Sequence, residues 1–188
     1  QKIKILDCTL RDGGYYNNWN FSKETVSSYF EAINNTDISV IEVGFRFLNK
    51  KKSHGKFAYI TDEEIKKIKI NKKIKIAVMI NASDILKNEK NKTTFSNLKY
   101  FLNKKKNSNV SYVRIATHFR EVNNLTKFIK PIRQQGYKVI INLMQASEKK
   151  EIDFKKALIL LKKTKSVDVV YFADSLGCMN VSDIARVC

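Results

Sequence analysis

Six apolar runs rich in β-branched residues recur along the chain, and each is followed by an amphipathic stretch. The predicted strands cover residues 2–6, 39–44, 73–80, 110–116, 137–144 and 168–173. The predicted helices cover residues 22–34, 61–68, 121–135 and 148–163, a broken stretch from 81 to about 105, and a last one from Val181. Ser22 and Thr61 are placed to cap two helices, and Thr61 with Glu64 fits a capping box. Strands that are apolar on both faces and joined by helices predict a parallel sheet covered by helices.

The spacing of the strands favours a TIM (β/α)8 barrel over a doubly wound sheet. Successive strands begin about 30 residues apart, which matches a chain of about 250 residues divided over eight units. Six βα units would make three quarters of a barrel. The only proline is Pro131 and no low-complexity linker interrupts the chain, so residues 1–188 are expected to form a single partial TIM-barrel domain.

Both ends of the sequence are expected to be cuts through a longer protein. The chain starts with Gln1, and Cys188 directly follows the helix-like stretch VSDIARV. Six parallel strands cannot close a barrel, so the first and last strands would keep unpaired backbone edges. We therefore expect the isolated 188 residues to associate edge to edge or to aggregate, and a homo-oligomer is among the expected states.

Three sequence features bear on where the protein is located in the cell. The first residues lack the regions of a signal peptide, and no run of about 18 apolar residues occurs. A cytoplasmic protein with no membrane partner is the expectation. The three cysteines, Cys8, Cys178 and Cys188, are odd in number and lack metal-site spacing, which predicts reduced thiols rather than disulfides or a zinc site.

The formal net charge of +18 raises the question of nucleic-acid binding. Lysines dominate this charge and fall in helical or loop stretches such as 50–52 and 104–106. Asn and Ile are also abundant, a bias that AT-rich coding produces, so most lysines are interpreted as solvated surface. A basic nucleic-acid-binding module remains an alternative of another class, and it predicts an affinity that falls steeply with salt.

Polar side chains lie in or directly after the carboxyl-terminal parts of four of the predicted strands. In a barrel of this kind the reactive groups lie at the carboxyl ends of the strands. Each group has a structural interpretation by itself, because Asp7 and Thr9 could cap a loop and Arg11 could pair with a neighbouring carboxylate. Taken together they favour a site for a metal or an anionic substrate, since burying several charges at one rim is costly. The segments are Asp7 to Gly14, Glu42 to Gly44, Arg114 to His118 and Ala173 to Gly177.

Four motifs at these positions carry a resemblance to a known family. They are LDCTLRDGG at 6–14, IEVG at 41–44, RIATH at 114–118 and FADSLGCM at 172–179. The first resembles the strand-one signature of the DRE-type TIM-barrel metallolyases, which include HMG-CoA lyase, isopropylmalate synthase and the pyruvate-forming aldolases. The third and fourth are most similar to the 4-hydroxy-2-oxovalerate aldolase branch. The resemblance spans the whole chain.

The resemblance implies roles for the residues of the first two motifs. Asp12 would be a ligand of a divalent cation, Mn²⁺ or Mg²⁺, for which a carboxylate oxygen is suited. Arg11 would face the enolate that develops when a carbon–carbon bond next to pyruvate breaks. Glu42 would orient Arg11 or support the metal site from behind.

The other two motifs would contribute to substrate binding. Arg114 lies in RIATH, and His118 would be structural or line the pocket. Asp174 and Ser175 would border the carboxylate end of pyruvate, although capping of the last helix is the alternative for both.

Two departures from the family pattern affect these roles. The aldolase branch has a histidine, its general base, where this chain has Tyr15. A tyrosine of pKa about 10 transfers protons only as an acid or with a lowered pKa, so the identity of the general base stays open. The aromatic loop Tyr15, Tyr16 and Trp19 could stack on a sugar or close the barrel mouth. The family also takes two metal ligands from an HxH motif, whereas the histidines here are His54, expected to be solvent-exposed, and His118.

The sequence therefore predicts a metal-dependent carbon–carbon lyase that cleaves or forms a 4-hydroxy-2-oxoacid through a pyruvate enolate, with an aldehyde as the other product or substrate. The isolated fragment is expected to bind metal weakly and to show little turnover, because one carboxylate makes a poor site. The alternative enzyme is a Claisen-type condensing enzyme that uses an acyl-CoA.

Overall fold

The chain was analysed as a computed structural model that describes residues 3–87 and 98–187. Its strands are β1 (Leu6–Asp7), β2 (Val40–Phe45), β3 (Lys75–Asn81), β4 (Val110–Thr117), β5 (Lys138–Leu143) and β6 (Val169–Phe172). They follow one another in chain order in one sheet, and the pairs β1–β2, β2–β3 and β5–β6 are parallel. Strands in chain order with helices between them make a partial TIM barrel of six βα units, as the sequence predicts.

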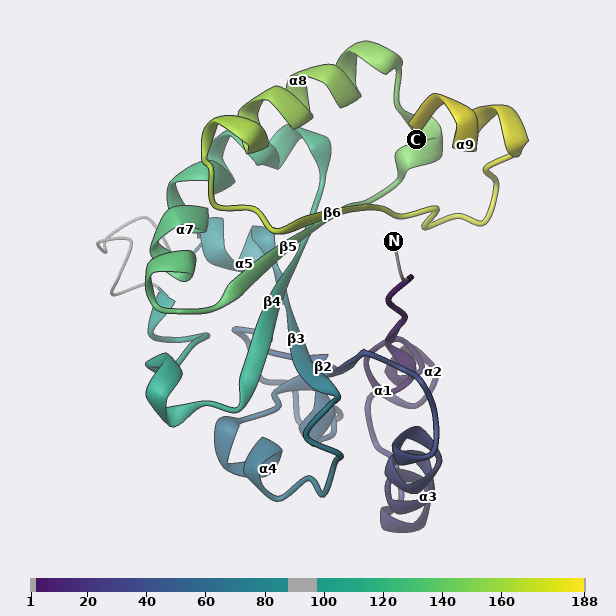
Figure 1. The fold of residues 1–188 in the computed structure, drawn as a ribbon, viewed down its shortest axis with the longest axis vertical. Helices are drawn as coiled ribbons and strands as arrows, with labels where there is room; N and C mark the ends of the chain where they lie inside the picture. The colour runs from purple at the N-terminus through teal and green to yellow at the C-terminus, as the bar shows by residue number, and fades with distance from the viewer. Residues whose placement is uncertain (1–2, 88–97, 188) are drawn as a thin grey trace. The chain divides into compact units, whose positions relative to one another are not determined.

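Helices separate successive strands (Figure 1). The α-helices are α1 (Thr9–Asp12), α2 (Gly14–Asn17), α3 (Lys23–Asn34), α4 (Asp62–Lys66), α5 (Ala82–Lys87), α7 (Val122–Gln134), α8 (Glu151–Lys163) and α9 (Val181–Val187). The 3-10 helices are η1 (Lys56–Ala58), η3 (Lys105–Asn107), η4 (Phe119–Glu121) and η5 (Ala146–Glu148). No described helix has the length and apolar character needed to cross a membrane.

Two compact units divide the chain. The first unit comprises Gln1–Met79 and Phe101–Val113, and the second comprises Ile80–Tyr100 and Arg114–Cys188. The single domain expected from the sequence stays a prediction.

Local sequence signals fix the helices of the first unit. Ser22 accepts a hydrogen bond from the Thr25 backbone N–H at 3.1 Å and begins α3. Thr61 and Glu64 form the predicted capping box of α4, with bonds of 3.2 and 3.1 Å. Both caps satisfy backbone groups that a helix start leaves without partners. β2 is buried along its whole length, as its unbroken apolar run predicts.

The first strand is shorter than predicted. Only Leu6 and Asp7 are in strand conformation, whereas Ile3 and Ile5 are exposed. β1 stands at the end of the strand order with β2 as its neighbour, so the apolar side chains before Leu6 have little to pack against. A broken helical stretch was predicted from 81 to about 105. The structure has α5 at its start and η3 at its end, and residues 88–97 lie outside the described residues.

The second unit is built on β5 and α7. β5 is buried after its first residue, and α7 buries one face against it. That face has the helical spacing of an amphipathic helix and comprises Val122, Leu125, Phe128, Ile129 and Ile132. α8 packs against α7 (Figure 1). The helix predicted from Val181 is present as α9.

Candidate active site

The turn after β1 carries the first group of predicted residues. Asp7 ends β1, and its two carboxylate oxygens accept hydrogen bonds from the Thr9 backbone N–H at 3.0 Å and the Thr9 hydroxyl at 2.9 Å. The Tyr29 hydroxyl from α3 donates to Asp7 at 2.6 Å. Burial raises the pKa of Tyr29, and the bond to Asp7 raises it further. Asp7 thus has the capping role considered for it, and it fixes the start of α1.

Arg11 is buried on α1 between two carboxylates. Its Nε donates to Glu42 Oε1 at 2.6 Å, and its Nη1 donates to Asp12 Oδ1 at 2.5 Å. The guanidinium carbon also lies 5.6 Å from the centroid of the Phe45 ring. Burial by itself lowers the pKa of Arg11, but the charge and hydrogen bond of Glu42 outweigh it, so the pKa is raised. Arg11 is therefore a permanent cation with a fixed orientation.

Glu42 and Asp12 differ in exposure. Glu42, in the middle of β2, is fully buried, whereas the Asp12 side chain is 63% exposed. Glu42 can therefore act only on its neighbours in the protein, while Asp12 can also reach a solute. Its exposed carboxylate suits a hard divalent cation as one ligand. Within residues 3–87 and 98–187, no three His, Cys, Asp or Glu side chains are grouped to hold a metal.

Trp19 locks the turn from the opposite side. It is only 4% exposed, and its Nε1–H donates to the backbone oxygen of Arg11 at 2.8 Å. Its ring packs edge-on against Phe45 and Phe47, at centroid distances of 5.6 and 5.3 Å. Trp19 serves as packing, because its ring is covered and its N–H is already bonded; this excludes stacking of that ring on a sugar.

The backbone around Trp19 has an uncommon conformation. Asn18 and Trp19 have φ angles of 54° and 60°, a region that costs bulky L-residues energy. A Cβ on Gly14 would lie 2.0 Å from the Trp19 ring, so only glycine fits beneath it. Tertiary contacts therefore hold this loop in place against its local preference.

Tyr15 lies at the surface beside Arg11. It is 61% exposed, and its ring meets Trp19 edge-on at 4.9 Å. Desolvation raises the pKa of Tyr15, and the neighbouring Arg11 charge acts in the opposite direction without reversing the shift. Tyr15 is accordingly a phenol at neutral pH, able to donate a proton or a hydrogen bond. Tyr16 is 95% exposed.

His54 is not solvent-exposed as expected. It is half-buried, with its ring 5.1 Å from the Trp19 ring and 6.2 Å from the Tyr59 ring. The sequence context, a lysine-rich loop, gave no sign of this packing. The reason is tertiary: the loop after β2 folds back onto the turn that carries Trp19.

Arg114 lies on β4, among the residues of the second unit. Its Nη2 donates to Asn142 Oδ1 on β5 at 2.8 Å, and its guanidinium carbon lies 5.0 Å from the centroid of the Tyr171 ring on β6. Asn142 and Tyr171 are paired in the β5–β6 register. Neither was predicted, although a single amide within the apolar run YKVIINLM was a signal in the sequence.

His118, Asp174 and Ser175 lie in loops after strands of the same unit. The His118 backbone N–H donates to Glu121 at 2.8 Å at the start of η4. Asp174 accepts from the backbone N–H groups of Cys178 and Met179, at 3.1 and 2.8 Å.

The helix-capping alternative for Asp174 and Ser175 is wrong. Ser175 accepts from the Gln145 backbone N–H at 3.1 Å, so neither residue bonds to α9. The α9 cap is instead formed by Asn180 and Asp183, which bond to each other's backbone N–H groups at 3.0 and 3.1 Å. Arg11, Asp12, Tyr15 and Glu42 thus belong to the first unit, where contacts join them, and the other predicted site residues belong to the second.

A second buried ion pair in the first unit escaped the sequence analysis. Arg46, directly after β2, lies 3.1 Å from the Asp62 carboxylate and donates to the Phe101 backbone oxygen at 2.7 Å. Asp62 also accepts hydrogen bonds from Asn103 and Ser108. These bonds join α4 to the segment before β4, which indicates a structural role.

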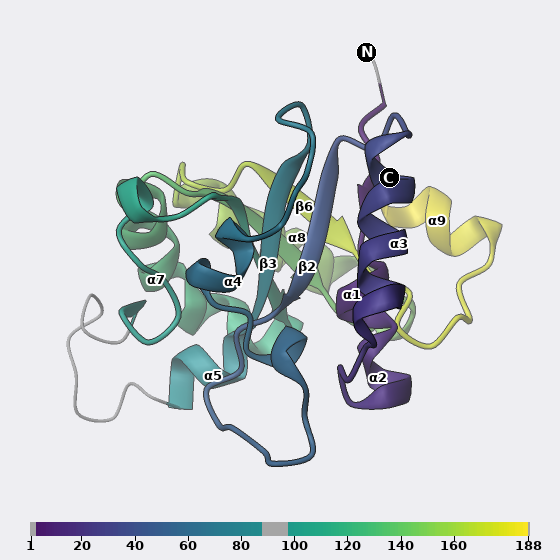
Figure 2. The same ribbon diagram turned by 90° about the horizontal axis from the view of Figure 1, so that it is seen from below.

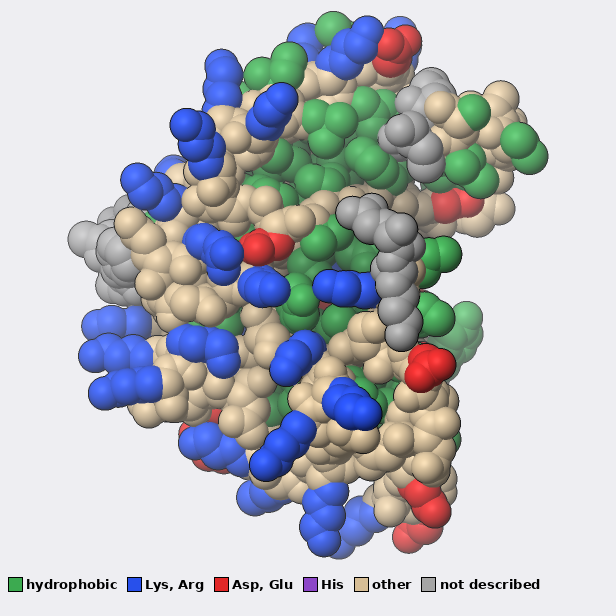
Figure 3. Space-filling view, viewed as in Figure 1, with side chains coloured by type: hydrophobic (Ala, Val, Ile, Leu, Met, Phe, Trp, Pro, Cys, Tyr) green, Lys and Arg blue, Asp and Glu red, His purple; other side chains and the backbone are tan. Residues whose placement is uncertain are grey.

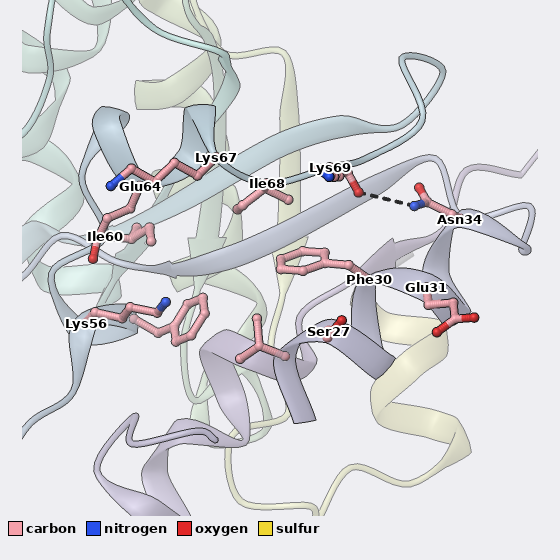
Figure 4. Close-up of a pocket in the computed structure, with 12 residues that line it drawn as sticks. Ser27, Phe30, Glu31, Asn34, Lys56, Ile60, Glu64, Lys67, Ile68 and Lys69 are labelled. Carbon is pink, nitrogen blue, oxygen red and sulfur yellow. Dashed lines mark hydrogen bonds between the residues drawn. The ribbon is translucent and has the colours of Figure 1, made fainter. Parts of the chain in front are cut away.

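The cavity at the outer surface of the first unit is separate from these groups. It measures about 520 Å³ and lies between α3 and the segment from η1 to Lys69 (Figure 4). Phe30, Phe57 and Ile60 form its apolar floor, and Lys56, Lys67 and Lys69 lie around it. None of the predicted site residues lines it.

The comparisons with known proteins agree on one family. The sequence model of the HMGL-like family matches residues 2–188. The 4-hydroxy-2-oxovalerate aldolases of Geobacillus genomosp. 3 and Pelotomaculum thermopropionicum are 26% and 28% identical to the chain, over 98% and 95% of its length. The chain spans about half the length of these curated relatives, 52% and 50%.

Solved structures have a similar fold. The N-terminal domain of a proposed aldolase from Bacteroides vulgatus superposes with a TM-score of 0.80 at 30% identity, covering 98% of this chain and 60% of that one. The HMG-CoA lyase of Brucella melitensis has a TM-score of 0.68 at 12% identity, covers 100% of this chain and 66% of its own, and supports the fold alone. With the family model matched along nearly its whole length, the chain belongs to the HMGL-like family, in which its curated relatives are aldolases.

Proposed function

We propose that this chain carries catalytic residues of a divalent-metal-dependent aldolase that cleaves or forms a 4-hydroxy-2-oxoacid through a pyruvate enolate. The observation that supports this most is Arg11, a buried cation fixed by Glu42 and Asp12 at the carboxyl end of β1. An enolate oxygen gains negative charge during the reaction. A cation already fixed beside it lowers the activation free energy, because no protein group has to reorient while the charge develops.

Asp12 would be one ligand of the metal, Mn²⁺ or Mg²⁺. Its carboxylate is exposed and offers oxygen ligands, which a hard cation prefers. One of the two oxygens accepts a hydrogen bond from Arg11. When bound, the cation would add positive charge at the enolate oxygen. The described residues contribute one ligand of a set, so we expect the 188 residues alone to bind Mn²⁺ weakly and to turn over little substrate.

Glu42 is the residue that orients Arg11. It is fully buried and accepts the Arg11 Nε–H at 2.6 Å, so the remaining guanidinium N–H groups are held in one direction. Because Glu42 is inaccessible to solutes, its effect on the reaction is indirect: it holds Arg11, and its charge helps to raise the pKa of Tyr15.

Tyr15 is proposed as the proton donor to the substrate's C4 oxygen. In the condensation direction, the new C3–C4 bond forms as the aldehyde oxygen takes the phenolic proton of Tyr15, and the tyrosinate formed is stabilised by Arg11 beside it. Cleavage is the reverse: the C4 hydroxyl returns its proton to the tyrosinate as the bond breaks, and the electron pair becomes the enolate. The raised pKa of Tyr15 keeps it in the donor form near neutral pH.

Residues of the second unit are proposed to bind the 2-oxoacid. Arg114 lies in the second half of β4, and His118, Asp174 and Ser175 follow the carboxyl ends of β4 and β6, where substrate contacts are made in this fold. We also propose that residues 1–188 act as one catalytic domain of a cytoplasmic enzyme whose substrates are small 2-oxoacids and aldehydes.

The test is pyruvate release by the full-length protein from a panel of 4-hydroxy-2-oxoacids, with and without Mn²⁺. We expect metal-dependent release that Asp12→Ala abolishes and that Asp37→Ala, the removal of an exposed carboxylate elsewhere in the first unit, leaves unchanged. Release from no member of the panel would contradict the proposal and favour acyl-CoA-dependent condensation.

A further inference from the structure

Three consecutive lysines lie in the loop that follows β2, on the side of the first unit where Arg11 stands. We call residues 48–55 the lysine loop; Lys50, Lys51 and Lys52 in it are exposed. In the part of the chain that the structure describes, no carboxylate pairs with them. They therefore form a local concentration of positive charge that no ion pair among the described residues neutralises.

The lysine loop is fixed in position. The Gly55 backbone N–H donates to Asn18 O at 2.8 Å, and the Asn20 side chain donates to Ser53 O at 2.8 Å. The Lys51 backbone N–H donates to the Tyr59 hydroxyl at 2.7 Å. A loop held at its middle and at its end presents its side chains from a defined place, which reduces the entropy lost when a ligand binds.

These contacts connect the lysine loop to the proposed active site. The loop bonds to Asn18 and Asn20, which flank Trp19, and Trp19 bonds to the Arg11 backbone at 2.8 Å. His54 stacks near the same ring, at 5.1 Å. Figure 2 shows the loop after β2 beside α2, at the carboxyl end of that strand. The lysines and the exposed Tyr15 and Tyr16 thus belong to one rim.

The charges on this rim are not equivalent. Arg11 is compensated by Glu42 and Asp12 and is assigned to the enolate end of the substrate. Among the described residues, no carboxylate forms an ion pair with the three lysines, whose loop bonds to the far side of the turn that carries Trp19. The position of the lysines suits a second anionic group at the other end of the substrate.

We propose that the lysine loop binds a phosphate ester carried by the aldehyde half of the substrate. The inference rests on the proposed aldolase function and deepens it. A phosphate ester carries nearly two negative charges and three acceptor oxygens near neutral pH, so it can engage several ammonium groups at once. Lysine is a compact, flexible point charge, suited to reaching a phosphate from a loop.

The competing explanation is that lysines are common everywhere on this protein. Lys and Arg side chains cover much of the face seen in Figure 3, and acidic ones are few there. The chain offers a matched control: Lys104, Lys105 and Lys106 are also consecutive and belong to the first unit, but they precede β4 and so stand at the amino ends of the strands.

The test compares two triple variants of the full-length protein, Lys50→Gln/Lys51→Gln/Lys52→Gln and Lys104→Gln/Lys105→Gln/Lys106→Gln. Binding of glycerol 3-phosphate, with glycerol as the unphosphorylated reference, is measured by calorimetry. We expect binding of the phosphate compound only, weakened about tenfold in the first variant, which is the size of one charge-assisted hydrogen bond, and unchanged in the second. Pyruvate release from 4-hydroxy-2-oxoacids with and without a terminal phosphate should show the same pattern in kcat/KM.

Either an equal loss in both variants or no loss in the first would overturn the inference, as would failure of glycerol 3-phosphate to bind the unaltered protein. The two proposals fail separately. If pyruvate is released equally well from substrates with and without the phosphate, the aldolase proposal holds and the lysine loop does not bind substrate. Phosphate binding without pyruvate release from any substrate contradicts the aldolase instead.

Discussion

Two of the buried arginines, Arg11 in the first unit and Arg114 in the second, are held in different ways. Arg11 is bonded to two carboxylates, one of them fully buried, whereas Arg114 is bonded to the Asn142 amide and packs on the Tyr171 ring. In sequence both are arginines near the ends of strands. The difference predicts unequal costs of removal, because Arg11 leaves a charge behind in the core and Arg114 leaves an amide.

The largest effect is expected from Arg11→Met. This change leaves the Glu42 carboxylate buried without its main cation, which costs about 3–5 kcal/mol of unfolding free energy. Urea unfolding measures it. The double variant Arg11→Met/Glu42→Leu should recover most of the loss, since it buries no charge; a double variant as unstable as the single one would contradict this account.

Gly14→Ala is expected to come next, at about 3 kcal/mol, because the added methyl would overlap the buried Trp19 ring. The matched control is Gly177→Ala in the second unit, where nothing lies near the added Cβ and only the φ of 66° is unfavourable, at a cost of about 1 kcal/mol. Equal losses in the two variants would show that the packing beneath Trp19 is looser than described.

Arg114→Met is expected to cost about 2 kcal/mol, the loss of a hydrogen bond from a charged group to a buried amide. The same urea experiment applies. A loss of unfolding free energy as large as that of Arg11→Met would contradict this difference. It would mean that Arg114 compensates a buried charge in the second unit, as Arg11 compensates Glu42 in the first.

The smallest effect concerns Tyr29, which supports α1 through Asp7. Its pKa is raised in the folded chain, so its contribution to stability is complete below the usual tyrosine pKa of about 10 and is lost as the pH rises above it. Unfolding midpoints measured from pH 8 to 11 should fall less in Tyr29→Phe than in the unaltered chain. Parallel curves would exclude this linkage.

Much of the fold followed from local patterns. The caps at Ser22 and Thr61 depend on residues three positions apart, and the buried strands are contiguous apolar runs, so neither needs distant information. The first strand was predicted too long, because its apolar residues depend on a neighbouring strand to bury them. Its extent is a property of the sheet and not of the segment.

The candidate site was predictable by residue type and strand position. Arg11, Asp12, Glu42 and Arg114 were chosen because polar groups at the carboxyl ends of parallel strands meet at one rim. The pairing of Arg11 with Glu42 was expected, and the structure has it. Asn142, which is separated from Arg114 by 28 positions, was not expected as its partner, because that pairing depends on the register of the strands.

The sequence by itself determined the βα rhythm, the helix caps and the resemblance carried by four motifs, because these depend on periodicity and on neighbours in the chain. Only the tertiary structure decided that Trp19 is buried with a left-handed backbone, that His54 packs on it, and that Asp12 is exposed while Glu42 is not. Those outcomes depend on which segments, distant along the chain, cover one another, and burial is a property of that arrangement and not of any single residue.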